Sequence, residues 1–543
     1  MRTYEVDERT IGRILADQAA DRGDHTCLRW QGSDISYTEM DQQTNRYANG
    51  FRSIGVEPGD HVSILMPNCP EFLYSLWGLS KLRAVAVPLN TAAKGDLLRY
   101  FITQSDSSWL VLGEEWLEQI TSAIRDVSHI KGICVFRHVN QEVDTSFSVA
   151  QPIYNMGAFD AADDRRPAVS VQGTDPHLIV YTSGTTGPSK GVVSPYTQGL
   201  SAGSHILEAF GYTSDDVLYT CLPLFHVNAL WYTVYTALYA GATVALAPHF
   251  SASNFWQEIR DNHATAFNTL GAMTNIIWKL PPSPADRDHG VRICVMVPVT
   301  RELSQGFKER YGITVVSAFA MTENYAVTIL NQDYPLDKAG SAGQPPSYSA
   351  LAIHDDDDKI VPNGTVGEIC IYPREPGLMM LGYYKMPDAT AEAMRNGWFH
   401  TGDRGYVDDD GYLFFVDRKK DAIRRRGENI SSYEVEMLIA KHPLVAEVAA
   451  VPVASELSED EVVAYVVLNS EQQLPYGELF EFCISEMARY MVPRFIYYID
   501  ALPKTPSEKV EKYKLRLHAE QCRDELWDSE VAYGRGSTSR FSS

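Results

Sequence analysis

An α/β fold is predicted for this sequence, with a large N-terminal region of several subdomains on parallel sheets and a small α+β C-terminal domain. The chain has 543 residues, and at about 150 residues per domain this gives room for two to four domains. Short apolar runs alternate with helical segments, the pattern of βαβ units whose strands form a parallel sheet. The hydrophobic fraction of 45% and the charged fraction of 22% are typical of a globular protein.

The N-terminal elements follow from local signals. Ser36 and Glu39 form a capping box that begins a helix running to about Ser53. Strands and helices then alternate. Strands are expected over residues 61–66, 85–87, 109–112, 178–180 and 291–299, and helices over residues 71–81, 96–104 and 202–210.

The C-terminal elements begin after about residue 421. The expected order is helix 433–441, strand 446–451, strand 462–468, helix 478–490 and strand 495–499. Residues 528–543 are polar and rich in Ser, Gly and Arg, which predicts a frayed tail. The acidic runs 355–358 and 408–411 are expected to be solvated hairpin turns, because they lack the spacing of an EF-hand calcium loop.

Composition excludes several classes of function. A net charge of −23 argues against a nucleic-acid binder or a polybasic membrane-surface protein. The eight cysteines stand alone, without a CxxC pair, so we expect reduced thiols in a cytoplasmic protein. No signal peptide is expected, because residues 1–8 contain no apolar run. Residues 217–257 lack charged side chains, but prolines interrupt them and a buried core is favoured over a membrane span.

Residues 181–191, Y-T-S-G-T-T-G-P-S-K-G, follow an apolar run and concentrate hydroxyl side chains, glycines and a lysine. Glycines let backbone N–H groups approach an anion, hydroxyls donate hydrogen bonds and lysine adds positive charge. A polyphosphate-binding loop is therefore predicted rather than a flexible Ser/Gly turn. Its binding residues are Thr182, Ser183, Gly184, Thr185, Thr186, Gly187 and Lys190. The segment is not a Walker A loop, because no glycine directly precedes Lys190.

A second motif, G-x-S-x-G at residues 199–203, matches a hydrolase nucleophile elbow. That elbow requires a strand directly before the serine, and here residues 202–210 have a helical pattern. We interpret the match as chance.

The phosphate loop resembles that of the adenylate-forming superfamily, which includes acyl-CoA synthetases, nonribosomal peptide adenylation domains and firefly luciferase. Other segments resemble its signatures in the same order: residues 222–226 (L-P-L-F-H), 317–323 (S-A-F-A-M-T-E), 340–345 (G-S-A-G-Q-P), 397–403 (G-W-F-H-T-G-D), 417–430 (D-R-K-K to G-E-N-I) and 502–509 (L-P-K-T-P-S-E-K). The resemblance covers about residues 10–520 and is nearest to carnitine/crotonobetaine-type CoA ligases.

The resemblance implies that a carboxylate attacks the α-phosphate of ATP to give an acyl-adenylate and pyrophosphate. Negative charge converges in this step, so cations and hydrogen-bond donors are needed. The implied catalytic residues are Lys190 and Thr322 at the phosphates, Glu323 at Mg²⁺ and Lys509 between the carboxylate and the α-phosphate. The implied nucleotide-binding residues are Ser317, Ala318 and Phe319 at adenine and Asp403 and Arg418 at ribose.

The acid pocket is expected near these segments. Its implied residues are His226, Asn228, Tyr232, Gly271, Met296, Val297 and Ala320. Tyr235 shares the helical spacing of Asn228 and Tyr232, and it is either a further wall or ordinary core. Met296, Val297 and Ala320 are larger than the residues the superfamily often has, which favours a short, polar or aromatic acid.

The resemblance also implies two domains that change their relative orientation. The expected division is residues 1–417 for adenylation, 418–421 as hinge with Lys420, 422–525 as a lid carrying Lys509, and 526–543 as tail. Arg425, Arg426 and Gly427 are expected at CoA, with a solvated charge run as the alternative. Glu508 replaces the usual glycine, which affects the geometry of the lysine loop.

Three functions remain open at this point. The first is an AMP-forming acid:CoA ligase that uses ATP, Mg²⁺ and CoA. The second is an adenylating enzyme that passes the acyl group to an amine or a carrier-protein thiol. The third is a catalytically inactive scaffold. Expected partners are a small carboxylic acid, ATP and the acyl acceptor, with no nucleic acid and no membrane span; a homodimer is compatible with the sequence.

Overall fold

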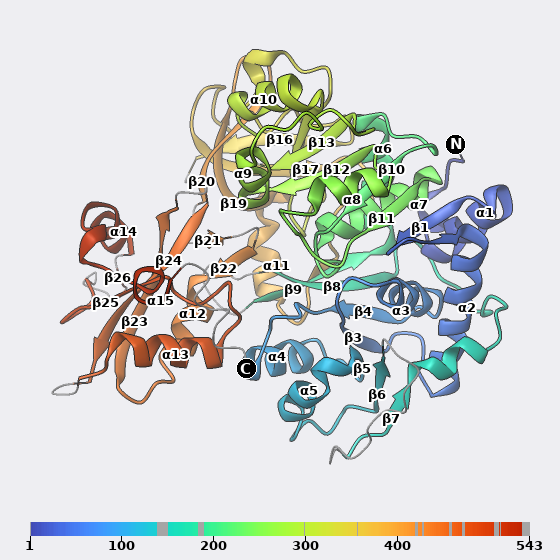
Figure 1. Ribbon diagram of the computed structural model, residues 1–543, viewed down its shortest axis with the longest axis horizontal. Coiled ribbons are helices and arrows are strands. Elements are labelled where there is room, and N and C mark those ends of the chain that lie inside the picture. Colours follow the sequence, from blue (N-terminus) through green and yellow to red (C-terminus); the bar gives the residue numbers. More distant parts are fainter. Residues whose placement is uncertain are drawn as a thin grey trace.

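The computed structural model describes residues 2–137, 150–182, 189–297, 299–355, 357–418, 422–425, 428–455, 459–469, 473–503, 510 and 512–534. Figure 1 shows a large N-terminal module, here defined as the described residues up to 418, and a smaller C-terminal module, the described residues from 422 onward. The predicted α/β fold with parallel sheets and a small second domain is confirmed.

The first large sheet has a parallel core and an antiparallel strand at each edge. Its strands in spatial order are β15 (Thr328–Leu330), β14 (Thr314–Phe319), β13 (Ile293–Val297), β12 (Ala266–Leu270), β10 (Val217–Thr220), β11 (Thr243–Leu246), β1 (Thr26–Trp30) and β2 (Ser33–Ser36).

The second large sheet is parallel over six strands and ends in an antiparallel pair. Its strands in spatial order are β18 (Gly382–Tyr383), β9 (Lys190–Pro195), β8 (Pro176–Thr182), β4 (Val85–Pro88), β3 (His61–Leu65), β5 (Trp109–Gly113), β6 (Gly132–Phe136) and β7 (Ile153–Asn155).

One hydrophobic core joins these two sheets, because buried residues of both belong to the same cluster. Parallel sheets of this kind are buried on both faces, and helices cover them. The helices of the N-terminal module are α1 (Ile11–Arg22), α2 (Tyr37–Ser53), α3 (Pro70–Lys81), α4 (Gly95–Gln104), α5 (Leu117–Ala123), α6 (Tyr196–Phe210), α7 (Thr236–Ala240), α8 (Phe255–Asp261), α9 (Gly271–Lys279), α10 (Arg301–Tyr311) and α11 (Pro387–Ala393). The capping box of α2 is confirmed: the backbone N–H of Glu39 donates to Ser36 Oγ at 3.2 Å.

The uncharged stretch folds as core. It contains β10, a π-helix over Asn228–Tyr235, α7 and β11, almost all of it buried. Among the described residues no helix is long and apolar enough to cross a bilayer. The G-x-S-x-G segment lies inside helix α6, which agrees with a chance match.

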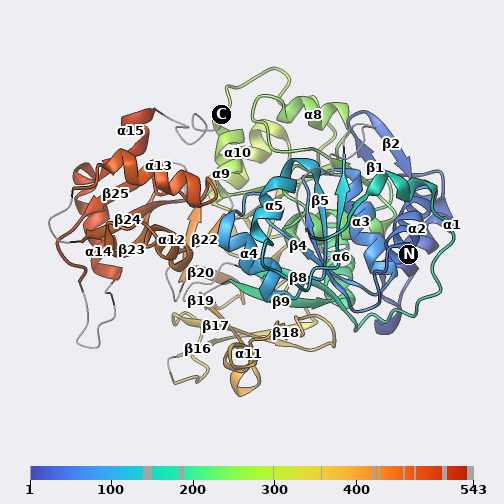
Figure 2. The same cartoon turned by 90° about the horizontal axis from the view of Figure 1, so that it is seen from below.

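A third, antiparallel sheet lies below the two large sheets in the view of Figure 2, with β20 nearest the C-terminal module. Its strands in spatial order are β16 (Ser349–His354), β17 (Gly367–Pro373), β19 (Phe399–Val407) and β20 (Leu413–Arg418). The acidic run 408–411 makes the tight turn between β19 and β20, as predicted.

The C-terminal module consists of a hairpin and a four-stranded sheet covered by helices. Its elements are β21 (Ala422–Arg425), β22 (Glu428–Ser431), α12 (Ser432–Ile439), β23 (Val445–Ala454), β24 (Asp460–Leu468), α13 (Tyr476–Glu486), β25 (Phe495–Tyr498), α14 (Lys512–Gln521), β26 (Trp527–Asp528) and α15 (Ser529–Tyr533).

The expectation of a frayed tail from residue 528 is wrong for its first part. Trp527 and Asp528 pair with β25, and the Arg494 guanidinium donates to Asp528 Oδ2 at 2.9 Å. Tyr533 of α15 stacks on Phe480 of α13 with ring centroids 5.5 Å apart. The segment is polar in composition, so its composition does not predict that Trp527 and Tyr533 fix it to the rest of the module. The end of the chain beyond residue 534 lies outside the described residues.

Lys81 fixes α3 to α2 through a buried ammonium group. Its side chain has no exposed surface, and Nζ donates to Asp41 Oδ1 at 2.8 Å, Thr44 Oγ1 at 2.7 Å and Asn45 Oδ1 at 2.7 Å. Burial lowers the pKa of Lys81 to about 8, although Asp41 opposes the shift.

We expect Lys81→Met to destabilise the protein by about 3 kcal/mol, because removal of one member leaves buried acceptors without a donor. Between pH 8 and 10.5 the folded protein has released a proton that the unfolded chain retains, so the contribution of Lys81 to stability rises with pH. Urea unfolding at pH 8 and pH 10 would measure both effects. Lys94→Met, at an exposed position, is the control; equal effects of the two variants would contradict the account.

Candidate active site

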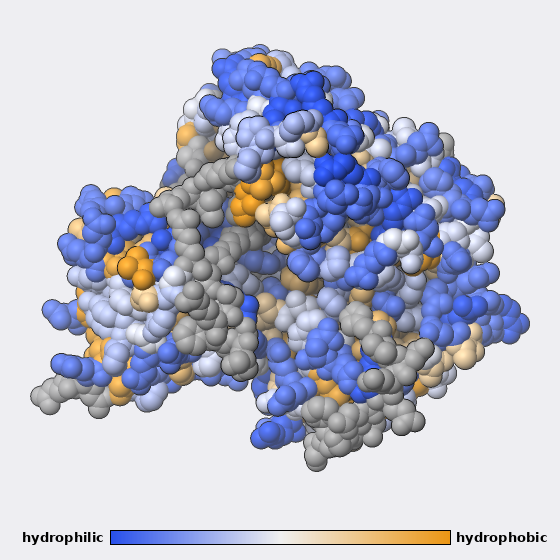
Figure 3. All heavy atoms as spheres, viewed as in Figure 1, coloured by the Kyte–Doolittle hydropathy of each residue, from blue (hydrophilic) through white to orange (hydrophobic). Residues whose placement is uncertain are grey.

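A cavity of about 1190 Å³ lies between the two modules. Figure 3 shows the molecule hollowed on this face between the C-terminal module and the rest of the chain. Both large sheets, the third sheet and the C-terminal module contribute to its lining. Because strand ends of separate sheets meet here, residues far apart in sequence share one cavity.

The β8–β9 hairpin delivers the flanks of the predicted phosphate loop. Thr182 and Lys190 are direct cross-strand partners and both line the cavity. Lys190 Nζ lies 4.3 Å from the centre of the Tyr383 ring, within the range of a cation–π contact. The loop residues 183–188 lie outside the described residues.

Glu323 follows β14 and is 6% exposed. The Tyr383 hydroxyl donates to its Oε1 at 2.8 Å, and Gln198 Nε2 donates to its backbone carbonyl at 3.1 Å. Mg²⁺ in nucleotide sites takes one or two protein carboxylates and completes its shell with phosphates and water. A buried carboxylate that shares its neighbour Tyr383 with Lys190 therefore fits that ion. Thr322 lines the cavity next to it.

An aromatic pair marks a second part of the cavity. Phe319 ends β14 and Phe415 lies on β20, with ring centroids 6.0 Å apart at an angle of 48°. Ser317 and Ala318 also line the cavity, and the Ser317 hydroxyl is engaged by donating to the Met296 carbonyl at 2.7 Å. An adenine ring can lie on such aromatic faces.

Asp403 is buried on β19 at the cavity wall, and β20 brings Arg418 opposite it in the strand register. A hydrogen bond fixes the backbone just before Asp403: the N–H of Gly402 donates to Glu368 Oε1 at 3.1 Å. Gly402 has a φ of 74°, a left-handed conformation that favours glycine. This carboxylate is therefore held at a fixed place beside the aromatic pair.

The predicted acid pocket is partly assembled. Lining residues include His226, Asn228, Tyr232, Val297 and Ala320, together with Trp231, Leu270 and Tyr325. Asn268 Nδ2 donates to Asn228 Oδ1 at 3.0 Å, and the Tyr232 hydroxyl donates to the Tyr325 carbonyl. Gly271 begins α9.

One expectation about this pocket needs correction, and of the two alternatives for Tyr235 the ordinary core holds. Met296 is fully buried outside the lining, because adjacent residues of β13 point to opposite faces and Val297 takes the cavity side. Tyr235 is also buried outside the lining. A π-helix has more residues per turn than an α-helix, so the spacing that aligns Asn228 and Tyr235 on one face no longer holds.

The C-terminal module closes the cavity through polar contacts. His226 Nε2 lies 2.9 Å from Glu428 Oε2, and the Ser189 hydroxyl donates to Glu434. Burial raises the pKa of Glu434 to about 8. Burial also opposes ionisation of Glu428, but His226 and Arg424 outweigh it and lower the pKa of that carboxyl.

The expectation that Arg425 faces CoA is wrong in this arrangement. Arg425 is buried inside the C-terminal module, where Nε lies 2.6 Å from Glu461 Oε2 and Nη1 donates to the Val492 carbonyl at 2.6 Å. Alternation along β21 turns the neighbouring Arg424 toward the cavity instead. Lys420, Arg426, Gly427 and Lys509 lie outside the described residues, as does the side chain of Arg418.

Several cavity residues have no signal in the sequence alone. Tyr383 belongs to a strand of two residues, and Phe415, Glu428 and Glu434 reach the cavity only through pairing between distant segments. Trp231 was within reach of prediction, since it adjoins Tyr232 in the same aromatic run.

Comparison with known proteins agrees with this geometry. Residues 15–384 match the family model of AMP-binding enzymes, and residues 434–509 match that of the AMP-binding enzyme C-terminal domain. The chain is 32% identical to a crotonobetaine/carnitine–CoA ligase of Salmonella paratyphi B, over 94% of this chain and 99% of the relative.

Two solved structures are similar over nearly the full length. A double mutant of o-succinylbenzoate CoA synthetase from Bacillus subtilis is 25% identical with a TM-score of 0.81, covering 92% of this chain and 97% of that one. A fatty acyl CoA synthetase of Mycobacterium tuberculosis is 29% identical with a TM-score of 0.66, covering 94% and 98%. The chain therefore belongs to the family of AMP-binding enzymes, the adenylate-forming acyl-CoA ligases.

Proposed function

We propose that this protein is an AMP-forming acid:CoA ligase that activates a carboxylic acid with ATP and transfers the acyl group to coenzyme A. The observation that carries the proposal is one cavity that combines Lys190, Glu323 and Asp403 with an aromatic acid pocket. Enzymes of the AMP-binding family use ATP, Mg²⁺ and CoA.

The residues divide the work of the first half-reaction. Lys190 and the hydroxyls of its loop would hold the β- and γ-phosphates, and Thr322 would donate to a phosphate oxygen. Glu323 would hold Mg²⁺, which supplies positive charge to the phosphates when bound. Phe319 would stack on adenine, while Asp403 and Arg418 would bind the ribose hydroxyls. Lys509 would neutralise charge between the carboxylate and the α-phosphate.

The second half-reaction requires a path for the acceptor. The β21–β22 hairpin turns Arg424 and Glu428 toward the acid pocket, where Glu428 pairs with His226. A cation at this rim suits the phosphates of CoA. We infer that the described arrangement favours acyl transfer and that a rotation near residue 420 brings Lys509 in for adenylation. The hinge and the domain boundaries remain part of the proposal.

The acid is proposed to be short and either polar or aromatic. Trp231, Tyr232 and Tyr325 wall the pocket with rings, and Asn228 offers an amide. Ala320 and Val297 take space that a long chain would need. The alternative acyl acceptor is an amine or a carrier-protein thiol. The location of the protein in the cytoplasm remains a prediction.

We expect Lys509→Ala to abolish acid-dependent pyrophosphate release while leaving thioester formation from synthetic acyl-adenylate and CoA largely intact. The physical reason is that the lysine leaves the cavity before the thiol attacks. The exposed Lys359→Ala is the control and should leave both half-reactions unchanged. Equal loss of both halves in Lys509→Ala would contradict the two-state account, and acyl transfer to amines but not to CoA would replace it with the alternative.

Asp403→Ala is expected to weaken ATP binding by about 1.5–3 kcal/mol, the usual range for hydrogen bonds to a charged group. Deoxy-ATP should then lose little further affinity in this variant, because its missing hydroxyl has no partner left. Calorimetry on both nucleotides would measure this. Asp409→Ala, an exposed carboxylate in the β19–β20 turn, is the control. Independent, additive losses would exclude direct contact between Asp403 and ribose.

Ala320→Gly should widen the range of acids, since one added methylene that does not fit costs about 1–3 kcal/mol in specificity. The ratio of kcat/KM for six-carbon and twelve-carbon acids would report the change, with Ala285→Gly outside the cavity as the control. Fastest turnover of acids with twelve or more carbons by the unmodified enzyme would overturn the pocket account.

A further inference from the structure

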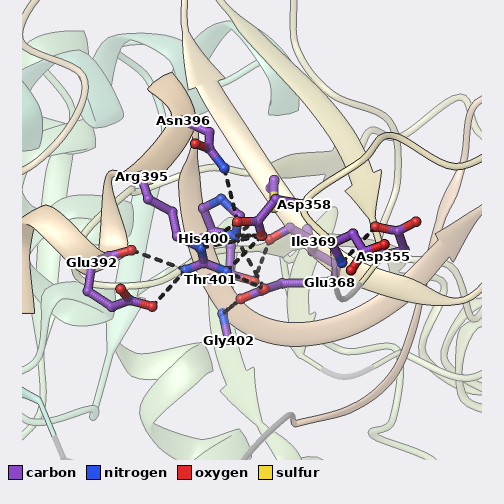
Figure 4. Close-up of polar contacts among 12 residues, drawn as sticks. Asp355, Asp358, Glu368, Ile369, Glu392, Arg395, Asn396, His400, Thr401 and Gly402 are labelled. Carbon is purple, nitrogen blue, oxygen red and sulfur yellow. Dashed lines mark hydrogen bonds and ion pairs between the residues drawn. The ribbon is translucent and has the colours of Figure 1, made fainter.

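The third sheet carries a cluster of side chains that could hold a metal ion, close to Gly402 and Asp403; two of them, Glu368 and His400, also line the cavity. In its register, His354 of β16 pairs with Glu368 of β17, and Cys370 of β17 pairs with His400 of β19. Glu368 and Cys370 are two residues apart, so they point to the same face of the strand. Three adjacent strands thus bring four potential ligands together (Figure 4 shows Glu368 and His400).

Three of these residues form one close group, Glu368 contacts it through His400, and all four are deeply buried. Suitable atoms of His354, Cys370 and His400 all lie within 4.8 Å of one another. His400 Nδ1 lies 3.3 Å from Cys370 Sγ and 3.2 Å from Glu368 Oε2. The four residues are 2%, 0%, 6% and 5% exposed in the order His354, Cys370, His400 and Glu368.

His354 leaves polar atoms unsatisfied. Within the described part of the chain, neither ring nitrogen of His354 has a hydrogen-bond partner. A buried polar group without a partner costs about 1–3 kcal/mol, so such atoms in a folded protein call for a ligand.

The donor set specifies the class of ion. Imidazole and thiolate together suit Zn²⁺ and similar borderline-soft divalent metals, whereas Mg²⁺ and Ca²⁺ prefer oxygen. With bonds of about 2.0–2.3 Å, the edges of a tetrahedral zinc site are about 3.3–3.7 Å long, close to the two distances from His400. The ligand atoms of His354, Cys370 and His400 lie within 4.8 Å of one another, so a shift of at most about 1–1.5 Å completes this geometry.

The surrounding charges are consistent with a bound cation. Arg395 lies 3.1 Å from Glu368 Oε2 and 3.0 Å from Asp358 Oδ2. With a divalent ion bound, the ion and Arg395 would carry three positive charges. A Cys370 thiolate, Glu368 and Asp358 would balance them. Arg395 therefore shares Glu368 with the ion and neutralises the second carboxylate.

We propose that His354, Cys370 and His400 form a structural site for Zn²⁺ or a similar divalent metal, and that Glu368, which contacts His400, completes the shell. The ion would tie β16, β17 and β19 together close to Thr401, Gly402 and Asp403. It would thus stiffen the turn that presents Asp403 to the cavity. The proposal stands independently of the acyl acceptor and of the acid.

The test uses the untagged full-length chain without nucleotide, with Co²⁺ and Zn²⁺ as probes. Co²⁺ titration should give a thiolate-to-metal charge-transfer band at one equivalent per chain, and Zn²⁺ should displace it. Cys370→Ala should lose the band, and His354→Gln should bind Co²⁺ roughly 100-fold more weakly, the upper end of the loss seen when residues that only support a metal ligand are replaced. Zn²⁺ should raise the thermal midpoint of the parent and not of these variants.

Two controls separate this site from other thiols. Cys134→Ala removes a buried cysteine of β6 that lies outside every candidate cluster of the described residues, and Cys522→Ala removes the thiol of the other cluster, His518, Cys522 and Glu525. Both controls should retain the band. A folded parent with no band, or a band lost in Cys522→Ala but kept in Cys370→Ala, would overturn the proposal and leave a hydrogen-bonded network in its place. Circular dichroism establishes folding, and His354→Gln keeps the test decisive if Cys370→Ala does not fold.

Discussion

The contact of Tyr383 with Lys190 and Glu323 is the interaction on which the rest of the cavity depends. Lys190 and Tyr383 belong to the second large sheet, while Glu323 follows β14 of the first. The Tyr383 hydroxyl donates to Glu323 and its ring lies beneath the Lys190 ammonium, so one side chain holds an acid and a base of opposite sheets at a fixed separation. The Met380 N–H also donates to the Glu323 carbonyl at 3.0 Å, which ties the connection before β18 to the same point.

The C-terminal module lines one side of the cavity, but it supplies none of the three residues Tyr383, Lys190 and Glu323. Its contacts combine polar pairs, Glu428 with His226 and Glu434 with Ser189, with a cluster of buried apolar residues drawn from both modules. Because burial holds the pKa of Glu434 near 8, this carboxyl is neutral below that pH, where its contact with the hydroxyl carries no charge penalty. Its contribution to closure weakens as pH rises through that value.

Sequence reasoning reached the features that depend on local patterns. The capping box of α2, the alternation from β3 through α3 to β4 and the order of the C-terminal elements need only periodicity and caps. It failed where pairing between segments distant in the sequence decides which side chain faces the cavity and which partner it has. The sequence of β13 does not tell which of Met296 and Val297 faces the cavity, and nothing near Arg425 indicates that Glu461 is its partner. The strand and helix that end the described chain were missed because two aromatic side chains anchor a polar segment.

The central claim is that this cavity activates a carboxylic acid by adenylation. The most direct measurement is exchange of labelled pyrophosphate into ATP, without CoA, over a panel of short polar and aromatic acids. The account predicts exchange that requires both Mg²⁺ and one of the acids. Binding of ATP, established by calorimetry, with no acid-dependent exchange across the panel and across longer acids would contradict it.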